Sequence, residues 1–154
     1  MTNIISYAQN FEDVMLWRAL GHIENGFYID LGAQDPLIDS VSMAFHEHGW
    51  RGIHVEPTPH YAELLRQQRP GDTVIQAAVG NGPAVLTFFE IPDTGISTAD
   101  PVIAQQHRER GFDVHEITVP YIALPTVSEV LVNHELHSSK DVNDAFDFYH
   151  RNDI

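Results

Sequence analysis

The stretch GFYIDLGAQDP, residues 26–36, decides how this chain folds. Its aromatic and aliphatic residues end in an acid, Asp30, followed by Gly32, a pattern typical of a buried strand that runs into a tight turn. After that turn, residues 38–48 place apolar side chains at helical spacing and close at Gly49, which predicts a helix. A strand, a glycine turn and a helix therefore form the first unit of the predicted fold.

The same unit is repeated further along the chain. Residues 53–56, IHVE, predict a second strand, with Thr58 and Pro59 as the N-cap and first position of the next helix. Residues 73–79 predict a third strand, and residues 10–20 a leading helix capped by Asn10. Because strands alternate with helices, we expect a parallel sheet with right-handed crossovers in an open α/β fold of the nucleotide-binding type.

In the second half of the chain, the predicted strands and helices no longer alternate regularly. Residues 84–91 follow the third strand after a short Gly-Asn-Gly turn, which predicts a hairpin that adds an antiparallel strand at the sheet edge. Later segments predict a helix at 101–110, a strand at 114–122 and a helix at 126–136, before a polar stretch with an apolar patch at Phe146, Phe148 and Tyr149. No repeat or linker divides the chain, so residues 1–154 are interpreted as one domain.

The composition excludes several classes of protein. A formal net charge of −14 without basic runs disfavours nucleic acid and anionic membrane surfaces as partners. The absence of cysteine excludes disulfides, thiolate zinc sites and cysteine nucleophiles. No apolar run approaches the roughly 18 residues of a membrane span. The N-terminus lacks the basic start and apolar core of a signal peptide, so we expect a cytoplasmic protein.

Candidate binding residues fall at the carboxyl ends of the predicted strands, where parallel sheets place their ligands. Asp30 and Gly32 end the first strand, Glu56 ends the second, and the small Ala77 and Ala78 near the end of the third leave room for a flat base. Asp30 could instead cap the following turn, and Glu56 could be a surface acid. As ligand contacts, the two acids suit a nucleoside that carries a positively charged amino-acid tail.

Two cofactors compete for this edge of the sheet. A dinucleotide site requires the motif G-x-G-x-x-G, but after Gly32 the chain reads Ala33-Gln34-Asp35-Pro36, so the later glycines are missing. Two acids, Asp30 and Asp35, would also face the phosphates. A ligand with cationic groups and no phosphate fits better, which describes S-adenosylmethionine.

Five segments together resemble FkbM-type methyltransferases: SYAQNFEDVMLWRAL (6–20), GFYIDLGAQDP (26–36), GWRGIHVEPTP (49–59), QAAVGN (76–81) and GIST (95–98). The resemblance implies a Rossmann-like class I methyltransferase fold, with three layers and a parallel sheet carrying antiparallel edge strands. It also implies S-adenosylmethionine as methyl donor and O-methylation of a hydroxyl on a sugar, polyketide or related small molecule. The cofactor contacts that it implies are Gln9, Asp13, Asp30, Gly32, Ala33, Glu56, Ala77 and Ala78.

One departure from the family pattern affects the expected activity. Family members continue through a strand that resembles H-F-L-K-I-D-V-E-G, and no D-V-E-G occurs in this sequence. We therefore expect a methyltransferase domain truncated at its C-terminus or completed by another chain. In that case residues 27–31 become an exposed apolar edge that could pair two copies, and the alternative function is a non-catalytic cofactor-binding or oligomerising domain.

The acceptor side of the site is less well marked. Ser97 and Thr98 of the GIST segment are candidate substrate contacts, and nearby Asp100 and His107 are weak candidates for the base that takes the hydroxyl proton. Among the histidines, His46 and His48 point to different helix faces. His134 and His137 share a face but lack a third ligand, so no metal site is predicted.

Overall fold

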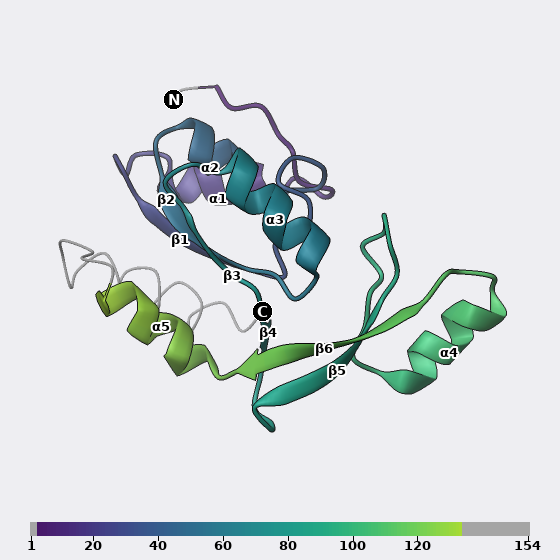
Figure 1. Ribbon diagram of the computed structural model, residues 1–154. Coiled ribbons are helices and arrows are strands. Elements are labelled where there is room, and N and C mark those ends of the chain that lie inside the picture. Colours follow the sequence, from purple (N-terminus) through teal and green to yellow (C-terminus); the bar gives the residue numbers. More distant parts are fainter. Residues whose placement is uncertain (1–2, 134–154) are drawn as a thin grey trace.

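The computed structural model describes residues 3–133 and shows a mixed α/β architecture (Figure 1). In chain order its elements are α1 (Glu12–Leu20), β1 (Phe27–Leu31), α2 (Met43–Glu47), β2 (Arg51–Val55), α3 (Pro59–Gln68), β3 (Thr73–Ile75), β4 (Ala78–Val79), β5 (Val85–Glu90), α4 (Pro101–Glu109), β6 (His115–Ile122) and α5 (Leu124–Asn133). None of the helices among these residues is long and apolar enough to cross a membrane.

The first three strands confirm the predicted parallel sheet. They are ordered β1-β2-β3, with Asp30 opposite His54 and Leu31 opposite Val55 in the register. Each connection advances by one strand, and right-handed crossovers therefore place α2 and α3 on the same face of the sheet. The carboxyl ends of β1 and β2 consequently lie side by side.

Apolar side chains fill both faces of this sheet. On one face, Trp17 of α1 and Phe45 of α2 pack with Trp50, and Tyr28 of β1 contributes from the sheet. On the other face, Ile53 and Val55 of β2 pack with Ala77 and with Val127 of α5. Alternate residues of a strand point to opposite faces, so Asp30 and His54 lie on the face that α1 and α2 cover.

The second sheet corrects two predictions. The strand expected at 73–79 is divided, because β3 pairs with β2 whereas β4 pairs with β6 in a separate sheet of order β4-β6-β5. The hairpin expected between residues 73–79 and 84–91 does not form, since β5 pairs antiparallel with β6. The glycine turn instead wraps around the Tyr121 ring, which occupies the space that a side chain at Gly80 or Gly82 would need.

Two helix starts also differ from the predictions. Helix α1 has Phe11 as its N-cap, in a left-handed conformation (φ 62°), whereas Asn10 binds the Glu12 carboxylate through its backbone N–H and its side-chain amide. Helix α2 begins at Met43 and not at 38, so Ile38 of the expected apolar stripe is 67% exposed. The preceding turn is held by the buried Arg69, which donates to the Pro36 carbonyl and to Ser40 Oγ.

The other predicted helices and strands agree with the structure where it describes the chain. Thr58 is the N-cap of α3 with Pro59 following it, and α4 and β6 lie where expected. Helix α5 begins at Leu124, two residues before the predicted start. Its predicted end at 136, the pair His134 and His137, and the apolar patch at Phe146, Phe148 and Tyr149 lie outside the described residues.

Candidate functional site

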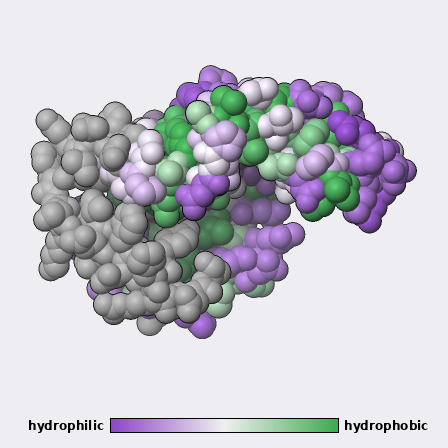
Figure 2. Space-filling view, turned by 90° about the horizontal axis from the view of Figure 1, so that it is seen from below, coloured by the Kyte–Doolittle hydropathy of each residue, from purple (hydrophilic) through white to green (hydrophobic). Residues whose placement is uncertain are grey.

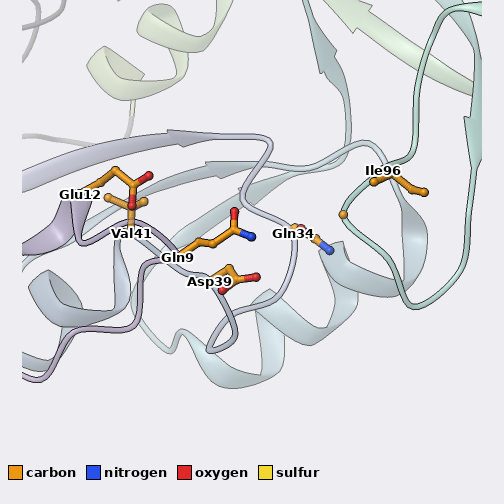
Figure 3. Close-up of a pocket in the computed structure, with 7 residues that line it drawn as sticks. Gln9, Glu12, Gln34, Asp39, Val41 and Ile96 are labelled. Carbon is orange, nitrogen blue, oxygen red and sulfur yellow. The ribbon is translucent and has the colours of Figure 1, made fainter. Parts of the chain in front are cut away.

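A pocket of about 410 Å³ opens beside the carboxyl end of β1 (Figure 3). Three segments far apart in sequence form it: the start of α1, the turns between β1 and α2, and the loop between β5 and α4. Its polar lining consists of two amides and two carboxylates, and no basic side chain takes part. The labelled lining residues are Gln9, Glu12, Gln34, Asp39, Val41 and Ile96, and Gly95 adjoins them.

The pocket wall depends on unusual backbone conformations. Gly32, Gln34 and Asp39 all have positive φ angles, at 71°, 51° and 58°. Only glycine adopts this region without strain, so the two other residues hold a conformation that costs free energy, as is common at functional sites. The turn is tied to β2 by the Gly32 N–H, which donates to the Val55 carbonyl at 2.7 Å.

Glu56 lies where the sequence predicts it, directly after β2, and joins two turns. Its Oε2 accepts from the Gln34 N–H at 2.8 Å, while Oε1 accepts from the Thr58 N–H at 2.8 Å and Thr58 Oγ at 2.7 Å. The residue is only 4% exposed, so it is a buried carboxylate and not a surface acid. It connects the pocket turn after β1 with the start of α3.

Asp30 sits at the end of β1 with its side chain 20% exposed. Its Oδ2 accepts from Ser42 Oγ at 2.6 Å and lies 3.7 Å from His54 Nδ1. Beyond His54, the Nε2 atom meets Oδ2 of Asp72 at 2.9 Å. The strand-end acid is thus connected to a buried second acid through a histidine in the middle of β2.

The surroundings of these groups shift their protonation equilibria. Burial opposes a charge on His54, but attraction to Asp30 and Asp72 outweighs it and raises the pKa of His54 above its usual 6.5. For Asp72, burial is likewise outweighed, here by hydrogen bonds from His54, Tyr28 and the Gly52 N–H, and its pKa falls below the usual 3.8. Burial lowers the pKa of the neighbouring His46, despite the attraction of Asp72.

Asp13 has a clear structural environment. It is fully buried, and its carboxylate accepts from Ser6 Oγ at 2.7 Å and from the backbone N–H groups of Tyr7 and Ala8 at 2.7 and 3.2 Å. It thereby fastens the N-terminal segment to α1. Gln9 of that segment does line the pocket, whereas the carboxylate beside it belongs to Glu12.

In the loop after β5, the residues that line the pocket are Gly95 and Ile96, which precede the predicted substrate contacts Ser97 and Thr98. Gly95 approaches Gln34 so closely that a Cβ at this glycine would lie 3.0 Å from the Gln34 Oε1. Ser97 Oγ accepts from the Ile91 N–H at 3.0 Å, and Thr98 Oγ accepts from the Asp100 N–H at 3.0 Å. The two predicted substrate contacts therefore shape the loop that carries Gly95 and Ile96 to the pocket.

The two candidate bases stand apart from the pocket. Asp100 is the N-cap of α4, accepting from the N–H groups of Val102 and Ile103 at 2.7 and 3.3 Å. His107 packs edge-on against Phe112 within the same helix and turn. Neither residue lines the pocket. Figure 2 shows hydrophilic residues, with some hydrophobic ones among them, at the α4 end of the molecule. The base role predicted for Asp100 and His107 remains a prediction.

The remaining predicted contacts divide between turn and core. Ala33 belongs to the pocket turn, and its N–H points to the Val55 carbonyl at 3.4 Å. Ala77 is 1% exposed and packs with the core of the first sheet, so it could meet a ligand only through its backbone. Ala78 is half-buried in β4. The cofactor contacts predicted at these residues remain predictions.

Sequence reasoning missed several residues of this region. Glu12, Asp39 and Val41 lie in stretches that predict helices, Gln34 lies in a turn and Ile96 in a loop, and only tertiary contacts bring the five together. His54 did carry a signal, because a histidine between Ile53 and Val55 in a buried strand needs polar partners. Among residues 3–133, no three His, Asp or Glu side chains are arranged so that they could hold a metal ion together.

Comparison with known proteins assigns the chain to a family. The model of the methyltransferase FkbM domain family matches residues 30–139, which is most of the chain. The chain therefore belongs to this methyltransferase family. The matched region contains both strand ends, the turn after β1 and the loop at Gly95 and Ile96. No curated protein and no solved structure matched the chain.

Proposed function

We propose that this chain is an S-adenosylmethionine-dependent methyltransferase domain of the Rossmann-like class I type, acting on a hydroxyl of a sugar, polyketide or related small molecule. The observation that carries the proposal is the pocket between the β1 turn, the start of α1 and the β5–α4 loop, in a chain of the FkbM family. The domain assignment to residues 1–154 is part of the same proposal.

The donor set around the β1 and β2 ends fits this cofactor. Asp30 Oδ1 has no partner among the described residues and can accept a hydrogen bond, and Oε2 of Glu56 accepts one hydrogen bond with capacity for another. No Lys or Arg lines the pocket, which suits a cationic ligand without phosphate better than a dinucleotide. In this proposal Glu56, at the end of β2, would hold the ribose hydroxyls through Oε2.

The pocket side chains supply the remaining chemistry. The cofactor brings a methyl group on positively charged sulfur, which is already electrophilic, so the protein must align an acceptor oxygen and remove its proton. Asp39 is the pocket carboxylate best placed to take that proton, since it is exposed and has no hydrogen-bond partner in the described chain. Glu12, by contrast, is engaged by Asn10. Asp39 would take the proton of the acceptor hydroxyl once that oxygen is aligned in the pocket.

Calorimetric titration of the full chain with S-adenosylhomocysteine tests the cofactor assignment. We expect saturable binding, and no heat at millimolar ligand would overturn the proposal. Methyl transfer is then assayed as S-adenosylhomocysteine formation with a panel of monosaccharides, glycosides and polyketides. Binding without transfer to any of them would support the non-catalytic alternative.

The Asp39 assignment has a matched control. Asp39→Asn should lower turnover by about 100-fold, the lower end of a general-base contribution, and leave S-adenosylhomocysteine affinity nearly unchanged. Asp93→Asn is the control, because Asp93 has the same φ of 58° and is exposed but does not line the pocket. Equal turnover in both variants would remove Asp39 from the mechanism.

A further inference from the structure

A buried line of polar groups runs behind the candidate site, from Asp72 through His54 to Asp30. The side chains of Asp72 and His54 have no solvent exposure, and that of Asp30 is 20% exposed toward the strand end. Asp72 Oδ2 accepts hydrogen bonds from His54 Nε2 at 2.9 Å and from the Tyr28 hydroxyl. Its Oδ1 accepts from the Gly52 N–H at 3.1 Å. Asp72 is therefore fixed on several sides, and His54 is the connection to Asp30.

The geometry around His54 favours its protonated form. A carboxylate accepts hydrogen bonds only, so Asp72 requires a proton on Nε2. His54 Nδ1 has no hydrogen-bond partner, and Asp30 Oδ2 lies 3.7 Å away. A bare Nδ1 would turn its lone pair toward a negative carboxylate in a buried setting, which is unfavourable. An imidazolium with protons on both nitrogens satisfies both acids.

The other charged groups around the cluster support this state. His46 of α2 lies 3.3 Å from Asp72, but its lowered pKa keeps it neutral at pH 7. Tyr28 of β1 packs edge-on against His54, and its raised pKa keeps its hydroxyl protonated. At the end of α3, Arg69 is 1% exposed and reaches the cluster through Ser40 and Ser42. With His54 charged, Asp30 and Asp72 face two cations, His54 and Arg69. A third cation, Arg51, donates to the His46 carbonyl nearby.

We propose that His54 is a positioning residue of the methyltransferase site: as an imidazolium anchored by Asp72, it holds the Asp30 carboxylate at the end of β1 in the orientation that the cofactor requires. This inference rests on the proposed function. His54 touches no ligand itself, because it is fully buried. Together with Ser42 it fixes Oδ2 of Asp30, which leaves Oδ1 for the cofactor.

The proposal makes cofactor affinity depend on pH through His54. S-adenosylhomocysteine should bind the full chain more tightly when His54 is protonated, and affinity should fall as the pH rises through the pKa of His54. By thermodynamic reciprocity, the ligand must then raise that pKa. His54→Gln removes the charge and should weaken binding by about tenfold at pH 6.5, which is the loss of one charged contact, and it should flatten the pH profile.

Calorimetric titrations with S-adenosylhomocysteine from pH 5.5 to 8.5 test the proposal. Asp72→Asn removes the anchor and should move the fall in affinity to lower pH, an effect that a purely structural loss would not produce. His22→Gln is the control, because His22 is exposed in the turn after α1. Ring ¹⁵N NMR of the unaltered chain gives a measurement that does not depend on variants. Both nitrogens of His54 should carry protons at pH 6.5, and the ligand should raise the titration midpoint.

The two proposals fail in different ways. If the wild type binds S-adenosylhomocysteine but His54→Gln keeps the same affinity and pH profile, the positioning role is overturned alone. The same conclusion follows if the NMR midpoint of His54 is unchanged by ligand. If the wild type binds no S-adenosylhomocysteine at any pH, the proposed function is overturned and the positioning role with it.

Discussion

Replacing Glu56 with alanine should destabilise the fold and weaken the cofactor site together. The carboxylate accepts three hydrogen bonds, two of them from the backbone N–H groups of Gln34 and Thr58, in a residue 4% exposed. A buried donor left without a partner costs about 1–3 kcal/mol. Water from the pocket can reach Gln34, which lines it, so we expect a loss of about 2–4 kcal/mol in the free energy of unfolding.

Urea unfolding followed by tryptophan fluorescence measures this loss, since Trp17 and Trp50 are both buried. Glu63→Ala is the matched control on α3, because its side chain is 58% exposed, and it should change stability by less than about 0.5 kcal/mol. Calorimetry should also show S-adenosylhomocysteine binding to Glu56→Ala weakened by about 1–3 kcal/mol, if the carboxylate holds the ribose. A variant as stable as the control would refute the bridging role, and unchanged affinity would remove Glu56 from the cofactor site.

Four further outcomes follow from the same structure. The raised pKa of His54 contributes stability that is complete below about pH 6.5 and is lost as pH rises through the folded value, so urea unfolding should show a decline toward alkaline pH that His54→Gln abolishes. Gly32→Ala should cost about 1–2 kcal/mol from backbone strain alone, because φ is 71° and no atom lies within 4 Å of the added Cβ; a much larger loss by the same assay would indicate a steric contact. Asp100→Ala should cost about 1 kcal/mol of stability through the lost N-cap of α4, and a fall in methyl transfer without that loss would support Asp100 as the catalytic base instead. Strand β1 pairs only with β2 among residues 3–133, so we expect a dimer by light scattering, and a monomer at high concentration would contradict edge pairing.

The sequence predicts the first sheet well because its signals are local. The buried strand residues, the glycine turn after Asp30 and the Thr58–Pro59 helix start each depend on a few neighbouring residues. Pairing in the second sheet is not local in this way. The sequence of residues 84–91 predicts a strand, but whether it joins the preceding segment or β6 depends on Tyr121, which fills the turn from about 40 residues away in sequence.

The same distinction explains which site residues could be found. Asp30 lies near the end of β1, and Gly32 and Glu56 directly follow β1 and β2, so topology places all three at one edge. The pocket's other residues depend on a turn that resembles a helix in sequence. Arg69, which is distant in the chain, donates hydrogen bonds to the Pro36 carbonyl and to Ser40 Oγ in that turn. Helix α2 begins after the turn, at Met43. The spacing of hydrophobic residues in a segment cannot predict such a contact, because the buried Arg69 guanidinium comes from the end of α3.

The buried charges behind β1 and β2 are poorly explained by stability alone. Taking Asp72, His54 and Arg69 out of water carries a large desolvation cost, and well-packed apolar residues of similar volume are often as stable as a buried ion cluster. What such a cluster provides is a defined geometry, because each hydrogen bond admits few orientations of its partners. Here the defined geometry ends at the Asp30 carboxylate, beside the turn that forms the pocket. The placement of these charges is therefore better accounted for by the demands of the site than by those of the fold.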